Sequence, residues 1–299
     1  RKRHASLFQK KMIALIGTVV CSTLIFVIFR IFEKFNIHTF QAIVINYLTA
    51  FLCGYFINFK EISKETFIHL DWLPFVGFSA LLFISLFILM AISSQKNGIA
   101  ATSVAVKMSM AVSMIGMILL YNEDVSYTKV IGIVLALIGV YLIAAPGASD
   151  TKKTSAYMLI ILFVGSGLLD LNLNYAQNHA LDHISASLFT AFGFGAAFII
   201  GLVVCLIQIL RAKAAPFHYK NAIAGLLLGI PNYYSIYFLL ESYNAIPWSD
   251  SSILALVNVS VVVLSVFMGL LAYKEALNIK KTVGIIASLL AILMLYISS

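Results

Sequence analysis

The chain has 299 residues, of which 62% are hydrophobic and 11% are charged, and its mean hydropathy is +1.00. Ordinary soluble domains are roughly 45–50% apolar and about 25% charged, so this composition excludes a soluble globular protein and indicates a protein whose solvent is the lipid bilayer. The net charge of +8 does not point to nucleic acid, because the basic residues form short clusters between apolar runs, where they meet lipid phosphates.

Ten apolar runs, separated by short polar breaks, are each long enough for a membrane helix, which needs about 20 residues. The first run is longer than the apolar region of a signal peptide, so we interpret it as a span. The spans predicted in the first half are Met12–Phe32, Ile37–Phe59, Trp72–Ser94, Gly98–Tyr121 and Lys129–Ala145. The spans predicted in the second half are Ser155–Gln177, Ile184–Leu210, Asn221–Tyr243, Trp248–Tyr273 and Thr282–Ile297.

The two halves of the chain resemble each other when one is shifted by 152 residues. Each half then has a polar Tyr-x-Glu turn followed, nine residues after its Glu, by a glycine, a pattern that chance matches between apolar helices do not explain. The matched residues include Tyr121 with Tyr273, Glu123 with Glu275, Lys129 with Lys281 and Gly132 with Gly284. We therefore predict two five-helix repeats, residues 1–148 and 149–299.

The odd number of spans in each repeat has a consequence for topology. The second repeat must enter the membrane upside down, which gives an inverted repeat of the kind by which many carriers alternate access; a duplicated scaffold without a transport role is the alternative. The basic N-terminal segment predicts that both termini are cytoplasmic. The basic residues of the second half would then lie outside, against the positive-inside rule: Lys152, Lys153, Arg211, Lys213, Lys220, Lys274, Lys280 and Lys281.

The turn and the glycine-bearing helix that close each half resemble EamA-type domains of the drug/metabolite transporter superfamily. The resembling segments are Tyr121-Asn122-Glu123 with Val130-Ile131-Gly132-Ile133 through Gly139, and Tyr273-Lys274-Glu275 with Val283-Gly284-Ile285. The resemblance implies a secondary carrier of small metabolites with a central cavity between the repeats. It names no substrate, since similar proteins carry amino acids, choline, sugars, phosphorylated sugars and nucleotide-sugars. The second half departs from the first where Ala291 replaces Gly139 and Val259 replaces Lys107.

Two ionisable residues, Lys107 and Asp170, lie well inside predicted spans, where a charge costs at least ~2.5 kcal/mol and needs a partner or a wet cavity. Lys107 could bind a substrate carboxylate or phosphate, or pair with an acid on another helix. Asp170 shares one helix face with Ser166 and Asn174. We expect this face to line the cavity, with Asp170 as a protonatable group, a substrate contact or the counterion of Lys107.

The eighth predicted span carries a stripe of two tyrosines and an acid, Tyr233, Tyr237 and Glu241, directly after Pro231. Because proline removes a backbone donor, we predict a kinked or broken helix here, of the kind that lines cavities. The tyrosines suit an amphipathic or cationic metabolite; aromatic packing with Glu241 near the interface is the alternative. Further cavity candidates are Asn46 and Asn258, although small polar residues also hold membrane helices together.

The sequence lacks zinc-hydrolase and phosphate-loop motifs, so we predict no enzyme activity, no cofactor and no metal site. Transport would then be driven by a gradient, with coupling to protons or another ion left open. We predict a multi-pass protein of the bacterial inner membrane that exports or exchanges a small organic metabolite such as an amino acid. The cavity would lie among the second, fourth, sixth, eighth and ninth spans. The alternatives are a carrier of phosphorylated or nucleotide-linked sugars and, from other classes, an intramembrane enzyme, a channel or a receptor.

Overall fold

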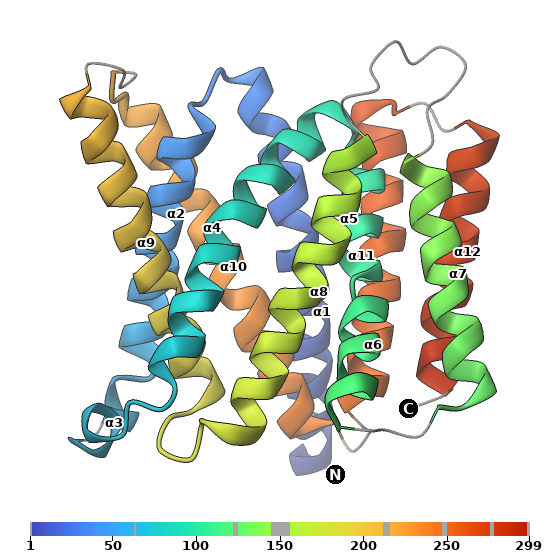
Figure 1. Cartoon of the computed structure of the whole chain (residues 1–299), viewed down its shortest axis with the longest axis horizontal. Helices are drawn as coiled ribbons and strands as arrows, with labels where there is room; N and C mark the ends of the chain where they lie inside the picture. The colour runs from blue at the N-terminus through green and yellow to red at the C-terminus, as the bar shows by residue number, and fades with distance from the viewer. Residues whose placement is uncertain are drawn as a thin grey trace.

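The computed structural model describes residues 2–62, 64–121, 125–144, 156–211, 216–246, 250–275 and 278–297. Apart from turns, the described residues are helical (Figure 1). In the first half the helices are α1 (Lys2–Lys34), α2 (Thr39–Ile57), η1 (Phe59–Glu61), α3 (Lys64–Ile68), α4 (Leu73–Lys96), α5 (Ile99–Met108), α6 (Met110–Tyr121) and α7 (Tyr127–Ala144). In the second half they are α8 (Ala156–His179), α9 (Ala186–Leu210), α10 (Tyr219–Ala245), α11 (Asp250–Tyr273) and α12 (Ile279–Ile297).

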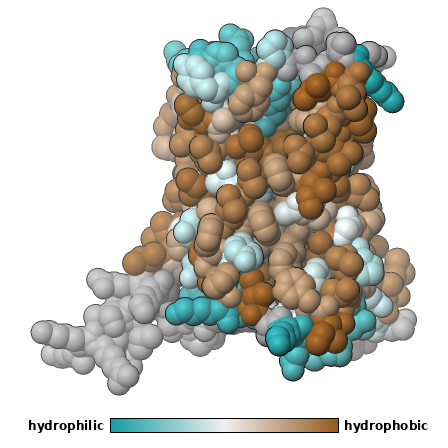
Figure 2. Space-filling view, turned by 90° about the vertical axis from the view of Figure 1, so that its left-hand side faces the viewer, coloured by the Kyte–Doolittle hydropathy of each residue, from teal (hydrophilic) through white to brown (hydrophobic). Residues whose placement is uncertain are grey.

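Ten helical spans within the described ranges are long and apolar enough to cross a membrane, with α5 and α6 together forming one of them. The predicted all-helical membrane fold of ten spans is therefore confirmed. Figure 2 shows the matching surface, on which an apolar belt separates two more hydrophilic ends. Since lipid offers no hydrogen-bond partners, only elements that satisfy their own backbone groups can cross such a belt.

Both chain ends lie at the same end of the helix bundle (Figure 1). We call this end the terminal face; it also holds α3 and the turn between α8 and α9. The opposite end, called the distal face, holds the turns from Lys34 to Thr39 and from Lys96 to Ile99, and the start of α12.

The helices of the two halves contact each other in a pattern that is nearly unchanged when the halves are exchanged. Helix α7 packs on α12, α2 on α9, and α5 on α11, so that equivalent helices meet. The two largest of the remaining contacts also have counterparts: α2 with α10 matches α9 with α4, and α1 with α10 matches α8 with α4. This pattern is consistent with an inverted repeat.

Of the kinked or broken helix predicted at Pro231, the break is wrong and the kink stays a prediction. Helix α10 continues through Pro231 from Tyr219 to Ala245. A single proline removes one intrahelical hydrogen bond, and the packing of α10 along α2 and α1 compensates for that loss. The interrupted span is instead the fourth, where Ser109 separates α5 from α6.

Candidate functional site

The interruption at Ser109 places polar groups in the middle of the bundle. The Ser109 carbonyl accepts hydrogen bonds from the amides of Val112 and Ser113, at 2.8 and 3.1 Å, so the first turn of α6 is closed on it. The Ser109 hydroxyl donates to Asp170 Oδ2 on α8, at 3.2 Å. The fourth span of the first half is thus tied to the first span of the second half.

Lys107 lies two residues before this interruption, and its charge interacts with that of Asp170. The two groups are not in direct contact, since the one ion pair among the described residues joins Arg30 to Glu33. Two opposite charges from the two halves therefore lie near each other within their spans without a direct ion pair. Such a pair could bind a ligand that carries both signs of charge.

The Asp170 side chain is exposed to solvent although it lies inside the bundle. The lipid side of α8 is marked by exposed Val164 and Leu168. Asp170 follows Leu168 by two residues, or roughly 200° around the helix, and so points the opposite way. On this inner face accessibility grows toward the terminal face, from buried Ser166 through exposed Asp170 to exposed Gln177. The accessible surface of Asp170 therefore lies on the inner side of α8 and not on its lipid side.

Asn174 lies one turn below Asp170, closer to the terminal face. Its Oδ1 accepts hydrogen bonds from the Tyr121 hydroxyl, at 3.4 Å, and from Asn178 Nδ2, at 3.3 Å. The ring of Tyr121 lies nearly parallel to that of His179, which in turn stacks on Tyr175 with the centroids 4.2 Å apart. The sequence reasoning missed this aromatic group, although Tyr175 and His179 are four residues apart and so share one helix face.

Asn258 on α11 lies beside the same interruption. Its Nδ2 is 3.7 Å from the sulfur of Met110, the first residue of α6, and Asn258 is only 4% exposed. Four of the eight predicted site residues thus gather around α5, α6 and α8: Lys107, Asp170, Asn174 and Asn258.

Asn46 and Tyr233 belong to a second polar group, between α2, α9 and α10. Asn46 Oδ1 accepts a hydrogen bond from Asn232 Nδ2, at 3.2 Å. The Tyr233 hydroxyl is 3.2 Å from Asn58 Nδ2 and 3.1 Å from Ser187 Oγ, and the tyrosine is 1% exposed. These contacts hold three helices together and leave the Tyr233 hydroxyl no free surface for a substrate. Asn58 and Ser187 were missed because each stands alone near a predicted span end.

Tyr237 and Glu241 continue along α10 away from Asn232. Tyr237 is partly buried and stacks on Tyr233 with the ring centroids 6.1 Å apart, whereas Glu241 is exposed. Helix α10 packs mainly on α2 and α1, with small contacts to α9 and α11. Among the described residues, neither side chain has a hydrogen bond or ion pair with Lys107 or Asp170.

Comparisons with known proteins agree with this architecture. A solved crystal structure aligns with a TM-score of 0.58 at 12% identity, over 96% of this chain and 96% of that one, which shows a shared fold. A Haemophilus influenzae (strain ATCC 51907 / DSM 11121 / KW20 / Rd) protein, described only as uncharacterized, is 29% identical over 290 residues, or 94% of this chain and 97% of that protein. Residues 9–145 match the EamA-like transporter family, so this first half of the chain carries an EamA-type domain, which indicates a transporter of the drug/metabolite type, and the ten apolar helices indicate a multi-pass membrane protein.

Proposed function

We propose that this protein is a secondary transporter that exports or exchanges a small zwitterionic metabolite, such as an amino acid, by alternating access about Lys107 and Asp170. The observation that carries the proposal is the pair of opposite charges from the two halves, which interact without a direct ion pair, with the Asp170 side chain accessible on the inner side of α8. A substrate ammonium would approach Asp170 and a substrate carboxylate would approach Lys107. Asn174 and Asn258 would supply neutral polar contacts on either side.

The same pair argues against a substrate that carries only negative charge. A phosphate would gain from Lys107 but would be repelled by the carboxylate form of Asp170. A zwitterion satisfies both charges, and each charge-assisted hydrogen bond contributes about 1.5–3 kcal/mol. We therefore place phosphorylated and nucleotide-linked sugars second.

Counterflow in proteoliposomes tests the proposal. Vesicles loaded with a mixture of unlabelled amino acids should accumulate a labelled member of the set by exchange. We expect Lys107→Gln and Asp170→Asn each to raise the half-saturating concentration about 10- to 100-fold, the cost of one charged contact. Lys96→Gln and Glu33→Gln remove exposed charges at the distal face and serve as matched controls. Uptake of sugar phosphates in place of amino acids would contradict the proposal.

Proton coupling is tested at the same carboxylate. If Asp170 carries the coupled proton, Asp170→Asn abolishes uptake driven by a pH gradient and leaves exchange between the two sides intact. Comparing pH-driven uptake with counterflow in the same vesicles separates these two steps. Undiminished pH-driven uptake by the variant would remove Asp170 as the coupling group.

A further inference from the structure

Helix α5 receives its N-terminal cap from the other half of the protein. Its own N-cap residue is Gly98, which has no side chain to bind the free amides of the first turn. The Glu275 carboxylate takes that role: Oε1 accepts from the amide of Ile99 at 2.7 Å, and Oε2 from that of Ala100 at 3.4 Å. A carboxylate at this position is favoured both by hydrogen bonding and by the positive end of the helix dipole.

The chain holds Glu275 in place with unusual backbone geometry after α11. Lys274 has a positive φ of 50°, and the Glu275 amide donates to the carbonyl of Gly269 at 2.9 Å. Two glycines make room for the carboxylate, since a Cβ on Gly98 or on Gly269 would lie 2.6 Å from Glu275 Oε2. Gly98 also has a φ of +91°, which other residues rarely adopt. The cap is therefore a built contact and not a chance approach of two surface groups.

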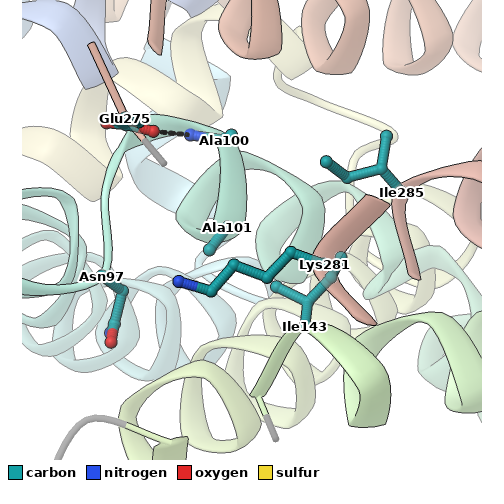
Figure 3. A pocket seen from close by; sticks show the side chains of 7 residues that line it. All are labelled: Asn97, Ala100, Ala101, Ile143, Glu275, Lys281 and Ile285. Carbon is teal, nitrogen blue, oxygen red and sulfur yellow. Dashed lines mark hydrogen bonds between the residues drawn. The ribbon is translucent and has the colours of Figure 1, made fainter. Parts of the chain in front are cut away.

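This contact closes the seam between the halves at the distal face. Figure 3 shows Glu275 reaching the start of α5, with a small pocket of about 20 Å³ beside it into which Lys281 extends. The pocket takes residues from both halves: Asn97, Ala100, Ala101 and Ile143 from the first, and Glu275, Lys281 and Ile285 from the second. Movement of α5 away from α12 would open this seam and break the cap.

The packing around Lys107 differs between its two sides. All seven residues from Ile99 to Ala105 are buried, including Ser103, which lies one turn above Lys107 on the same helix face. On the other side, Asp170 and Gln177 are exposed along the inner face of α8. The distal side of the site is thus the more tightly packed of the two, as expected if this face is closed.

We propose that Glu275 is the gating residue of the distal face: its cap on α5 holds this face closed, and the cap must break for the site to open there. The proposal rests on the alternating access proposed above. Glu275 is a positioning residue, because it acts through α5 and does not touch the substrate. Loss of the negative charge weakens the cap and shifts the population toward the state open at the distal face.

Cysteine accessibility tests this role without knowledge of the substrate. Cys21, Cys53 and Cys205 are free thiols and are first replaced by alanine. Ser103→Cys and Gln177→Cys are then made singly, with and without Glu275→Gln, and labelled in detergent by a membrane-impermeant maleimide. We expect Glu275→Gln to raise the labelling rate at position 103 at least ~5-fold and to lower it at position 177, a population shift of about 1 kcal/mol. Glu33→Gln, which removes another distal-face acid, should change neither rate.

The outcomes separate gating from a structural role. Faster labelling at position 103 together with slower labelling at position 177 supports the gate. A rise at both positions means that the variant is loosened overall and overturns the proposal, as does an unchanged rate at position 103. Counterflow in the same background distinguishes the two proposals: exchange that persists with unchanged labelling refutes only the gate, and a labelling shift without exchange of any amino acid refutes only the transport function.

Discussion

At the scale of single residues, polar side chains within the spans divide into two kinds. Asp170 is exposed and interacts with Lys107 without a direct ion pair, whereas Asn46 and Tyr233 are buried and bonded to neighbouring helices. Both kinds look alike in the sequence, since each is a polar residue within an apolar run. The difference is the partner on another helix, and only the first kind offers a surface to a substrate.

Removing the Tyr233 hydroxyl measures how much a buried, hydrogen-bonded polar residue contributes to stability. Tyr233→Phe removes the group that contacts Asn58 and Ser187, and it leaves Asn58 Nδ2 with fewer buried partners. We expect the free energy of unfolding to fall by about 1–3 kcal/mol, seen as a lower melting temperature in detergent, with the half-saturating substrate concentration unchanged. Tyr234→Phe is the matched control. It also removes a tyrosine hydroxyl from this aromatic group, but one with no hydrogen-bond partner among the described residues. A changed half-saturating concentration in Tyr233→Phe would instead assign Tyr233 to the substrate site.

At the scale of elements, the glycines that carry the family resemblance are explained by the contact of α7 with α12. A Cβ on Gly139 would lie 3.0 Å from the carbonyl of Gly284, and one on Gly284 would lie 2.9 Å from that of Gly139. The two backbones approach so closely that side chains cannot fit between them, which is how small residues drive helix association in lipid. These glycines are therefore packing residues of the fold and lie away from the charged pair.

Gly139→Ala tests this close approach. We expect the added methyl group to cost about 1–3 kcal/mol of stability, because Ser288 and the carbonyl of Gly284 already occupy its space. Gly77→Ala is the control, since a Cβ on Gly77 of α4 meets no atom within 4 Å. Melting temperatures in detergent should fall for the first variant and hold or rise for the second. Equal melting temperatures would show that α7 and α12 can separate without cost.

At the scale of the whole molecule, charge is distributed unevenly between the two faces. The distal face carries these basic residues among those described: Arg30, Lys34, Lys96, Arg211, Lys220, Lys274, Lys280 and Lys281. The terminal face has Lys60, Lys64 and Lys129, together with the basic segment at the start of α1. Under the positive-inside rule, the two sets of basic residues predict opposite orientations in the membrane. We propose that the N-terminal segment prevails, because the first helix usually dominates insertion, and that both termini are cytoplasmic in a bacterial inner membrane.

C-terminal fusions decide the orientation. A green fluorescent protein fused after Ser299 should fluoresce, and an alkaline phosphatase at the same position should be inactive, if the terminal face is cytoplasmic. The protein would then be open to the cytoplasm in this structure, with Glu275 closing the outer side. The reverse pair of signals would place the distal face inside, and the basic residues of the second half would then obey the positive-inside rule.

The sequence by itself determined the ten spans, to within a few residues at each end, because a membrane span depends on the local run of apolar residues. It also predicted that Lys107 and Asp170 require each other or water, because an isolated charge in lipid is too costly. Only the tertiary structure decided that Ser109 and not Pro231 interrupts a span, that Tyr233 is a packing residue, and that Glu275 caps a helix 176 residues away. Those features depend on which helix faces meet. The ten spans have similar apolar patterns, so the pattern alone does not predict which faces pair.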